Sequence, residues 1–201
     1  DDELFCGYNR YIKGYNIWNK LRNFPPPTRK VLSSLLNTVP AHIFERLQSV
    51  LPLQLQVSSL AEKIPKLADA LTYSDVNSYY KSLISHSKNP TEIVLGSIDL
   101  EKSMNRPGDK SISRMQEQMM YWDMINYLPD GILTKVDRAS MSLGLEARVP
   151  LLDHNIVEFA WKVPNDFKYR DGQGKWLLRQ VLYRHIPKEL MDRPKMGFSL
   201  P

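Results

Sequence analysis

Several residue types on which common functional sites depend are scarce in this sequence. Its 201 residues include one cysteine, Cys6, so no disulfide can form within the chain and we expect a reducing, cytoplasmic location. No histidine lies near Cys6 in the sequence, which favours a buried thiol over a nucleophile. The four histidines stand at positions 42, 86, 154 and 185, without the spacing of zinc ligands, so we predict no zinc site.

Long hydrophobic runs and a dominant charge are also missing. No apolar run approaches the roughly 20 residues of a transmembrane helix, and no basic-then-apolar leader opens the sequence, so we expect no membrane partner. The net charge is +5, but the basic residues are spread along the chain rather than gathered on one face. We therefore expect no nucleic-acid partner. A pocket for ATP or pyrophosphate accounts for a few of the lysines equally well.

Glycine is scarce too, with 9 residues, and strand signals are nearly absent, so the apolar spacing predicts a mainly α fold. We predict helices from residue 4 to 12 and over 29–37, 41–50, 53–70 with a break at Pro65, from 73 or 74 to about 86, and over 113–127, 132–143, 154–161, 175–185 and 187–191. Thr28 and Asp153 are expected N-caps, and Gly144 is an expected C-cap. Residues 129–131 (Pro-Asp-Gly) predict a turn, and residues 85–113 are rich in loop signals.

Charged side chains with a candidate role follow that turn. Asp137 and Arg138 lie on the predicted helix over 132–143, and an arginine fork can hold a carboxylate with two hydrogen bonds. Glu146 and Arg148 flank one residue of an extended link, so both point to the same side. Together these four residues predict a buried polar network that orients a substrate. The alternatives are a solvated helix face and a local salt bridge.

Three further residues are candidates for binding phosphate and metal. Lys195 sits in a loop framed by proline and glycine, and Lys175 follows Gly174 at a predicted helix start, where anions are favoured. Both could instead be ordinary surface lysines. Asp2, in the acidic start of the chain, is a candidate Mg²⁺ ligand, because that ion takes one or two carboxylates beside phosphate oxygens.

Four blocks of this sequence read Asp2-Glu-Leu-Phe-Cys-Gly-Tyr-Asn-Arg-Tyr11, Leu133-Thr-Lys-Val-Asp-Arg-Ala-Ser-Met141, Glu146-Ala-Arg-Val-Pro-Leu-Leu-Asp153 and Arg193-Pro-Lys-Met-Gly-Phe198. They resemble the synthetase domain of glutamine-hydrolysing asparagine synthetases, in the order of that family. The resemblance implies that the chain is the helical C-terminal portion of an α/β synthetase domain, of the adenine-nucleotide α-hydrolase-like type. It makes residues 1–201 a fragment of a single domain.

The resemblance also implies an activity and a role for each candidate residue. ATP adenylates the side-chain carboxylate of aspartate, and ammonia from glutamine then forms the amide. Asp2 matches a ligand of the Mg²⁺–pyrophosphate, while Lys175 and Lys195 match lysines at the phosphates, Lys195 being the catalytic one. The acceptor pocket is matched by Asp137, Arg138, Glu146 and Arg148.

Parts of the family pattern are not found here. The Ser-Gly-Gly-x-Asp-Ser pyrophosphate loop, an acidic residue before the first block and the N-terminal glutaminase domain are absent, and Asp1 and Cys6 replace small residues. We therefore expect a piece of a longer protein that is inactive alone and acts with a glutaminase domain of the same parent chain. A homodimer stays open. So do an amidotransferase for another carboxylate, such as a sugar acid of surface polysaccharides, and a non-catalytic helical module that binds a protein.

Overall fold

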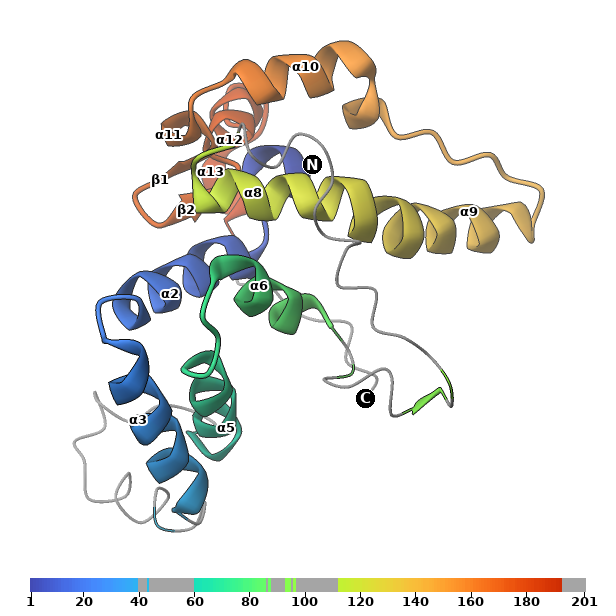
Figure 1. Cartoon of the computed structure of the whole chain (residues 1–201). Helices are drawn as coiled ribbons and strands as arrows, with labels where there is room; N and C mark the ends of the chain where they lie inside the picture. The colour runs from blue at the N-terminus through green and yellow to red at the C-terminus, as the bar shows by residue number, and fades with distance from the viewer. Residues whose placement is uncertain are drawn as a thin grey trace. The chain divides into compact units, whose positions relative to one another are not determined.

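The computed structural model describes residues 1–39, 43, 60–85, 87, 93–94, 96 and 112–192. The described part is mainly helical, which confirms the mainly α prediction (Figure 1). None of the described helices is long and apolar enough to cross a membrane. The chain divides into two compact units, Asp1–Ile12 with Lys110–Pro201 as unit 1 and Lys13–Asp109 as unit 2. Because two units can belong to one domain, the single-domain assignment stays a prediction.

Unit 1 is built around its first helix, α1 (Asp2–Phe5), which contacts α8 (Met115–Trp122), α10 (His154–Lys162) and α12 (Trp176–Leu182). Leu4 and Phe5 of α1 are almost fully buried and meet Ala160 of α10 in the core. Partly buried hydrophobic side chains complete this cluster: Met124, Val157, Trp161, Leu177 and Leu178. Segments from both ends of the sequence therefore share one core.

The predicted single helix at the start of the chain is wrong. It ends at Cys6, whose backbone is left-handed with φ 58°, and helical structure resumes as the π-helix η1 (Arg10–Gly14) and α2 (Tyr15–Leu21). Leu4, Phe5 and Tyr11 are buried as the apolar spacing indicates, but the break at residues 6–8 redirects the chain between them. Periodicity alone did not show this break, because apolar residues continue at helical spacing across it.

The predicted turn at residues 129–131 is also wrong. Helical structure runs without interruption through α8, the π-helix η5 (Asp123–Leu133) and α9 (Thr134–Met141), as the yellow rod in Figure 1 shows. Pro129 lies inside η5. In a π-helix each N–H bonds five residues back, and this wider spacing relieves the clash that a proline ring makes in an α-helix. Met119 and Trp122 of α8 are buried.

A small hairpin in unit 1 was not predicted. Strands β1 (Tyr169–Arg170) and β2 (Gln173–Gly174) pair antiparallel, with Tyr169 opposite Gly174. The turn residues Asp171 and Gly172 both have positive φ, as a tight hairpin turn requires. The hairpin links α11 (Asn165–Lys168) to α12 and delivers Lys175 to the start of that helix. The last described helix, α13 (Lys188–Met191), confirms the predicted short helix there.

Unit 2 contains α2, α3 (Pro26–Thr38), α5 (Leu60–Ala70) and α6 (Val76–Ile84). Helix α3 packs on α5, and the Ser33 hydroxyl donates to the Ala68 carbonyl at 2.7 Å. Two predictions fail in this unit. Thr28 lies inside α3, because the prolines at residues 26 and 27 suit the first helical turn. Pro65 lies inside α5 instead of ending a helix.

Two predicted caps in unit 1 are confirmed. Gly144 has φ 70° just after α9, and the Leu145 N–H donates to the Ser140 carbonyl at 3.1 Å across this end. The Asp153 carboxylate accepts the Asn155 N–H at 2.9 Å at the start of α10. Of the other predicted segments, most of 41–50, 53–59 and most of 85–111 lie outside the described residues.

Candidate functional site

The two ends of unit 1 meet at Lys175, which stands 173 positions after Asp2. Its ammonium nitrogen lies 2.6 Å from Asp1 Oδ2 and 3.1 Å from Asp2 Oδ2. The Lys175 backbone N–H donates to the Phe5 carbonyl at 2.8 Å, which fixes the start of α12 against the end of α1. We call Asp1, Asp2, Gly7, Gly174 and Lys175 the lysine cluster. The structure thus brings together two of the predicted site residues, Asp2 and Lys175.

Two glycines permit this close approach. A Cβ on Gly7 would lie 2.1 Å from Asp2 Oδ1 and 2.3 Å from Lys175 Cε, so the ion pair occupies the space that a side chain would fill. A Cβ on Gly174 would lie 2.2 Å from the Cys6 carbonyl oxygen. Neither glycine was singled out as a site residue from the sequence, where nothing shows that residues 7 and 174 are neighbours.

Left-handed backbone marks both sides of the contact. Cys6 has φ 58° and Lys175 has φ 57°, and neither is glycine. Such residues cost on the order of 1–3 kcal/mol each and persist where the surrounding structure enforces them, often at functional sites. The predicted buried thiol is confirmed, since Cys6 is fully buried, and burial raises its pKa to about 12 against a smaller lowering by Lys168.

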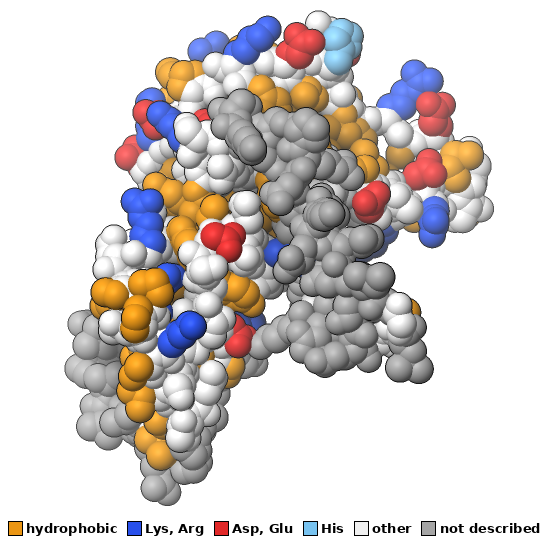
Figure 2. Space-filling model, in the orientation of Figure 1, with side chains coloured by type: hydrophobic (Ala, Val, Ile, Leu, Met, Phe, Trp, Pro, Cys, Tyr) orange, Lys and Arg blue, Asp and Glu red, His pale blue; other side chains and the backbone are white. Residues whose placement is uncertain are grey.

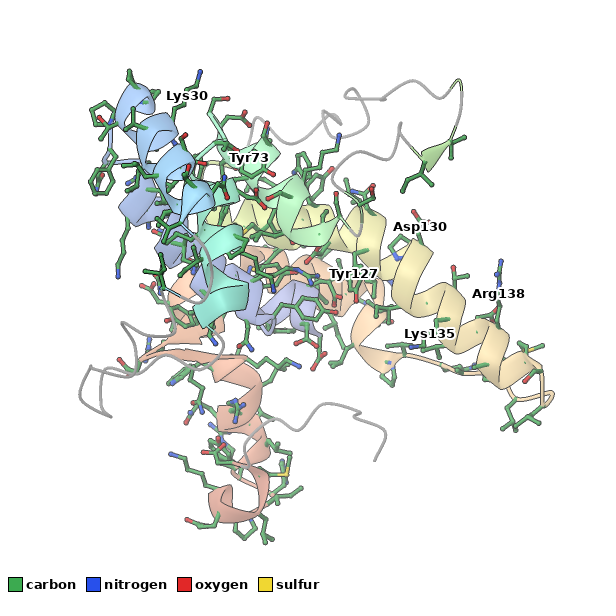
Figure 3. The ribbon with its side chains drawn as sticks, turned by 90° about the horizontal axis from the view of Figure 1, so that it is seen from below. Lys30, Tyr73, Tyr127, Asp130, Lys135 and Arg138 are labelled. Atoms are coloured by element: carbon green, nitrogen blue, oxygen red, sulfur yellow. The ribbon has the colours of Figure 1, made fainter. Side chains whose placement is uncertain are left out.

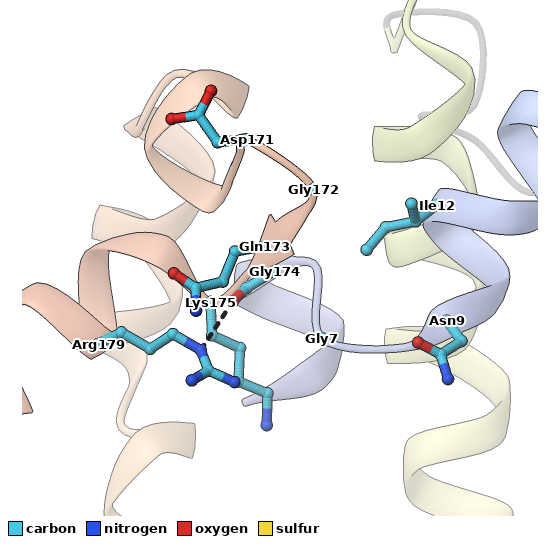
Figure 4. Close-up of a pocket in the computed structure, with 9 residues that line it drawn as sticks. All are labelled: Gly7, Asn9, Ile12, Asp171, Gly172, Gln173, Gly174, Lys175 and Arg179. Atoms are coloured by element: carbon cyan, nitrogen blue, oxygen red, sulfur yellow. Dashed lines mark hydrogen bonds between the residues drawn. The ribbon is translucent and has the colours of Figure 1, made fainter. Parts of the chain in front are cut away.

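A cavity of about 330 Å³ adjoins the lysine cluster (Figure 4). Its lining comes from the turn after α1, from η1, from the hairpin and from α12: Gly7, Asn9, Ile12, Asp171, Gly172, Gln173, Gly174, Lys175 and Arg179. Arg179 donates to the Gly174 carbonyl at 3.2 Å and pairs with Asp192 at 2.7 Å. The cavity therefore combines backbone polar groups with two cationic side chains, a lining suited to an anionic ligand.

A buried ion pair braces the segment that follows the cluster. Arg10 donates from Nε to Asp123 Oδ2 at 2.9 Å, and the Tyr11 hydroxyl donates to the same oxygen. The Arg10 guanidinium also lies over the rings of Tyr8 and Tyr127, 4.1 and 4.8 Å from their centroids. Asp123 is fully buried, and its Oδ1 has no hydrogen-bond partner among the described residues. This pair ties the first sequence block to the start of η5 and was not anticipated from the sequence.

The four residues predicted to line an acceptor pocket are exposed in the described structure. Asp137 and Arg138 lie on α9, and Figure 3 shows Arg138 pointing away from the helix. Glu146 and Arg148 are joined at 3.0 Å, with side chains 70% and 82% exposed. We call these four residues the α9 surface. The predicted common direction of Glu146 and Arg148 is confirmed, but they form a local salt bridge rather than a buried network.

The same stretch exposes apolar side chains beside its charges. Met141, Leu143 and Leu145 are 53%, 78% and 61% exposed. At the right of Figure 2, where α9 ends in Figure 1, hydrophobic and charged side chains lie together. The structure does not bring the α9 surface and the lysine cluster into contact by any hydrogen bond or ion pair between described residues. Lys195 lies outside the described residues.

The lysine cluster fits a divalent cation in part. Among the described residues there is no group of three or more metal-ligating side chains. However, Mg²⁺ needs only one or two carboxylates when phosphate and water supply its other ligands. Asp1 and Asp2 offer such a pair, and the Lys175 ammonium already lies between them as a stand-in cation, in space that the missing side chain of Gly7 provides.

Comparisons with known proteins identify a family and several relatives that this chain resembles. Residues 2–201 match the model of the family described as asparagine synthase. The chain is 28% identical over 202 residues to asparagine synthetase (glutamine-hydrolyzing) 1 of Bacillus subtilis, with 100% of this chain and 29% of that protein covered. Asparagine synthetase (glutamine-hydrolyzing) 3 of the same organism is 33% identical over 91 residues, or 45% of this chain and 15% of that protein.

A mammalian relative matches over a shorter stretch. Asparagine synthetase (glutamine-hydrolyzing) of Bos taurus is 40% identical over 68 residues, which are 32% of this chain and 12% of that protein. No solved structure matches the chain significantly. The chain therefore spans less than a third of the length of these relatives.

Proposed function

The chain belongs to the asparagine synthase family, and we propose that it forms part of an ATP-dependent synthetase that amidates the side-chain carboxylate of aspartate. ATP, aspartate and ammonia released from glutamine are its substrates, and Mg²⁺ is its metal. The chain supplies the helical C-terminal portion of an α/β synthetase domain. A glutaminase domain of the parent chain supplies the ammonia, and the protein works in the cytoplasm, alone or as a homodimer.

The lysine cluster is the observation that carries this proposal. It joins Asp2 of the first block to Lys175, which lies between the third and fourth blocks, over a glycine whose missing side chain makes room for the ion pair. A carboxylate for a metal and a lysine for phosphate are the groups that pyrophosphate departure requires. Side chains held in place before the reaction stabilise developing charge without reorganising.

The reaction gives each residue a task. A carboxylate oxygen of aspartate attacks the α-phosphorus of ATP, and the bond to the β-phosphate breaks to release pyrophosphate. Bound Mg²⁺ would neutralise charge on the leaving pyrophosphate. Lys175 orients the phosphates from the start of α12, and we propose that Lys195 stabilises the charge that grows on them. The ammonia lone pair then attacks the acyl carbon, AMP leaves, and water takes the proton.

The α9 surface is proposed to bind the acceptor. Arg138 and Arg148 each offer a planar fork that can hold a carboxylate with two hydrogen bonds. Asp137 and Glu146 can accept from the amino group of aspartate or hold those arginines in position. An exposed site of this kind needs a cover before it can exclude water, and the remaining length of the relatives offers enough chain for one. A different carboxylate as acceptor is the variant of this proposal that the same residues permit.

One observation favours a second candidate, a non-catalytic module that binds a protein. The apolar side chains of Met141, Leu143 and Leu145 are exposed beside the charged ones. Exposed apolar patches of this kind mark interaction surfaces. A binding module requires no reaction at the lysine cluster, so activity measurements separate the two candidates.

Pyrophosphate release tests the synthetase proposal. The full natural protein would be given ATP, Mg²⁺, aspartate and ammonia, and wild type compared with the variants Lys175→Ala and Lys195→Ala. We expect release to fall by about 100-fold or more in each, the range seen when one group that stabilises developing charge is removed. Lys162→Ala is the matched control, because Lys162 is exposed on α10 and, among the residues that the structure describes, pairs with Glu158 alone.

The outcomes are distinct. No release from wild type with aspartate, but release with another carboxylate, would keep the synthetase and change its acceptor. No release with any carboxylate would favour the binding module. The purified 201 residues alone should be inactive, and aspartate-dependent release from them would contradict that expectation.

A further inference from the structure

We propose that Lys175 and a divalent cation exchange places at the carboxylates of Asp1 and Asp2. The lysine ammonium holds the cation position while no phosphate is bound, and a phosphate-bearing ligand draws it away so that the metal can bind. This inference rests on the proposed function, in which Asp2 binds Mg²⁺ and Lys175 binds phosphate. It adds an order of binding to these two roles: the phosphate-bearing ligand draws the ammonium away first, and the metal then binds.

The distances place the ammonium where a bound cation would lie. Lys175 Nζ is 2.6 Å from Asp1 Oδ2 and 3.1 Å from Asp2 Oδ2, so it contacts both carboxylates at once. Mg²⁺ sits about 2.1 Å from its oxygen ligands, and on these oxygen atoms it would lie within about 5 Å of the ammonium. At that separation the two cations repel each other strongly in a partly buried site. The side chains are 23% to 36% exposed, so water screens this repulsion only in part.

The lysine side chain is free to move while its backbone is fixed. The Lys175 N–H donates to the Phe5 carbonyl at 2.8 Å, and its own carbonyl accepts the Arg179 N–H at 2.9 Å. In the described part of the chain its ammonium pairs with the two aspartates alone, and it ends a flexible four-carbon stem. The adjoining cavity of about 330 Å³ is lined by Lys175 itself and gives the ammonium room to swing (Figure 4).

This arrangement couples metal and phosphate. A metal ion alone must displace the ammonium and leave it without a partner, so its binding is weak. A phosphate group that pairs with the ammonium frees both carboxylates, so the metal then binds more tightly. Because such coupling is reciprocal, bound metal also strengthens phosphate binding by the same factor. The site thus favours a metal–phosphate complex over either component alone.

Arg179 provides the control within the same cavity. It carries the same charge as Lys175 one helical turn further along α12. Its guanidinium pairs with Asp192 and Tyr183 and donates to the Gly174 carbonyl, but no ion pair joins it to Asp1 or Asp2 in the described part of the chain. Removing Arg179 lowers the local positive charge without vacating the cation position. If exchange occurs, replacing Lys175 therefore changes the metal affinity of the site, and replacing Arg179 does not.

The test measures Mn²⁺ binding to the full natural protein by electron paramagnetic resonance, without nucleotide. We expect Lys175→Met to bind Mn²⁺ at least about tenfold more tightly than wild type, because one competing charge is gone. Arg179→Met should bind as wild type does. Added pyrophosphate should reduce the difference in Mn²⁺ affinity between wild type and Lys175→Met, because in wild type it pairs with the Lys175 ammonium and draws it away from the carboxylates.

Each other result overturns the exchange. Equal affinity in wild type and Lys175→Met means that the ammonium does not compete, and equal gains in both variants reveal only a general charge effect. A gain that survives Asp2→Asn in the Lys175→Met background places the metal elsewhere. Since Mn²⁺ binding needs no turnover, its failure is separate from failure of the proposed function, which shows as absent pyrophosphate release.

Discussion

Two regions of unit 1 carry charged residues of the family blocks, and they are held very differently. In the lysine cluster, three charged side chains are partly buried, contact one another, and lie over a glycine with no room for a Cβ. On the α9 surface, four charged side chains are exposed, and the one ion pair found among them joins residues two positions apart. One region is fixed by contacts between distant parts of the sequence, whereas the other is fixed only by its own helix and link.

The two regions differ in preorganisation: the lysine cluster is held in position, whereas the α9 surface only presents suitable chemical groups. The lysine cluster is positioned in the chain as it stands, so its geometry can be tested directly. The α9 surface presents suitable chemistry, but nothing in the described structure holds its side chains in the arrangement that a substrate needs. Variants in the two regions should therefore differ in how far they disturb stability.

The largest loss of stability is expected from Asp123→Ala. This fully buried carboxylate pairs with Arg10 and Tyr11 and ties the first block to η5. Removing one partner of a buried ion pair leaves an uncompensated charge and costs about 3–5 kcal/mol. Urea unfolding measures the change, and Asp123→Asn, which keeps the shape and an acceptor oxygen, should lose less. A loss of unfolding free energy smaller than that of an exposed ion pair would mean that the Arg10–Asp123 pair does not stabilise the fold.

Gly174→Ala should cost about 3 kcal/mol, because the new Cβ would meet the rigid Cys6 carbonyl oxygen. The matched variant Gly144→Ala has open space and only a left-handed backbone against it, so we expect a loss of about 1 kcal/mol. Thermal and urea unfolding of both variants compare the regions directly. Equal losses would show that the close approach of Gly174 to the Cys6 carbonyl oxygen costs no more than the left-handed backbone at Gly144.

Cys6 gives a smaller effect that depends on pH. Burial raises the pKa of its thiol from about 9 to about 12, so the folded state keeps the proton that the unfolded chain releases. The stability gained is complete below pH 9 and is lost as the pH rises towards 12. Between pH 9 and 12 the thiol lowers the unfolding free energy of wild type by at most about 1.4 kcal/mol per pH unit, and Cys6→Ala should lack this part of the decline.

Unfolding free energies of wild type and Cys6→Ala between pH 7 and 11 provide the measurement. Burial also raises the pKa of Tyr8 and of Tyr79, so both proteins share a remaining alkaline decline. Parallel curves for the two proteins would contradict a buried, neutral thiol.

The smallest effect on stability is expected from Glu146→Gln. Its salt bridge with Arg148 is exposed, so breaking it in the 201-residue chain should change the unfolding free energy by no more than about 0.5 kcal/mol. In the full natural protein the same variant should raise the KM for the acceptor carboxylate. A large destabilisation of the isolated chain would show that the α9 surface is packed after all.

Local sequence signals predicted much of the helical framework. Asp153 and Gly144 mark helix ends because side-chain capping and left-handed backbone are local preferences. Local reasoning failed where a wider context decides, as at Pro129 inside η5 and Pro65 inside α5. The hairpin had a signal that went unused, since Asp171-Gly172 is a favoured pair for a two-residue turn.

In the candidate site too, local properties could be predicted from the sequence and long-range contacts could not. The sequence predicts Asp2 as a metal ligand and Lys175 as a phosphate ligand, because the chemistry of a side chain belongs to the residue itself. Their pairing across 173 positions, the need for Gly7 and Gly174, and the Arg10–Asp123 brace could not be predicted, since each depends on which distant segments pack together.

The sequence by itself determined the mainly helical fold, the family blocks and the kinds of chemical group available, because periodicity, caps and side-chain type are local properties. Only the tertiary structure decided that the lysine ammonium lies between two aspartates and that the α9 surface is open. Those outcomes depend on burial and distance, which arise when α1, the hairpin and α12 share one core.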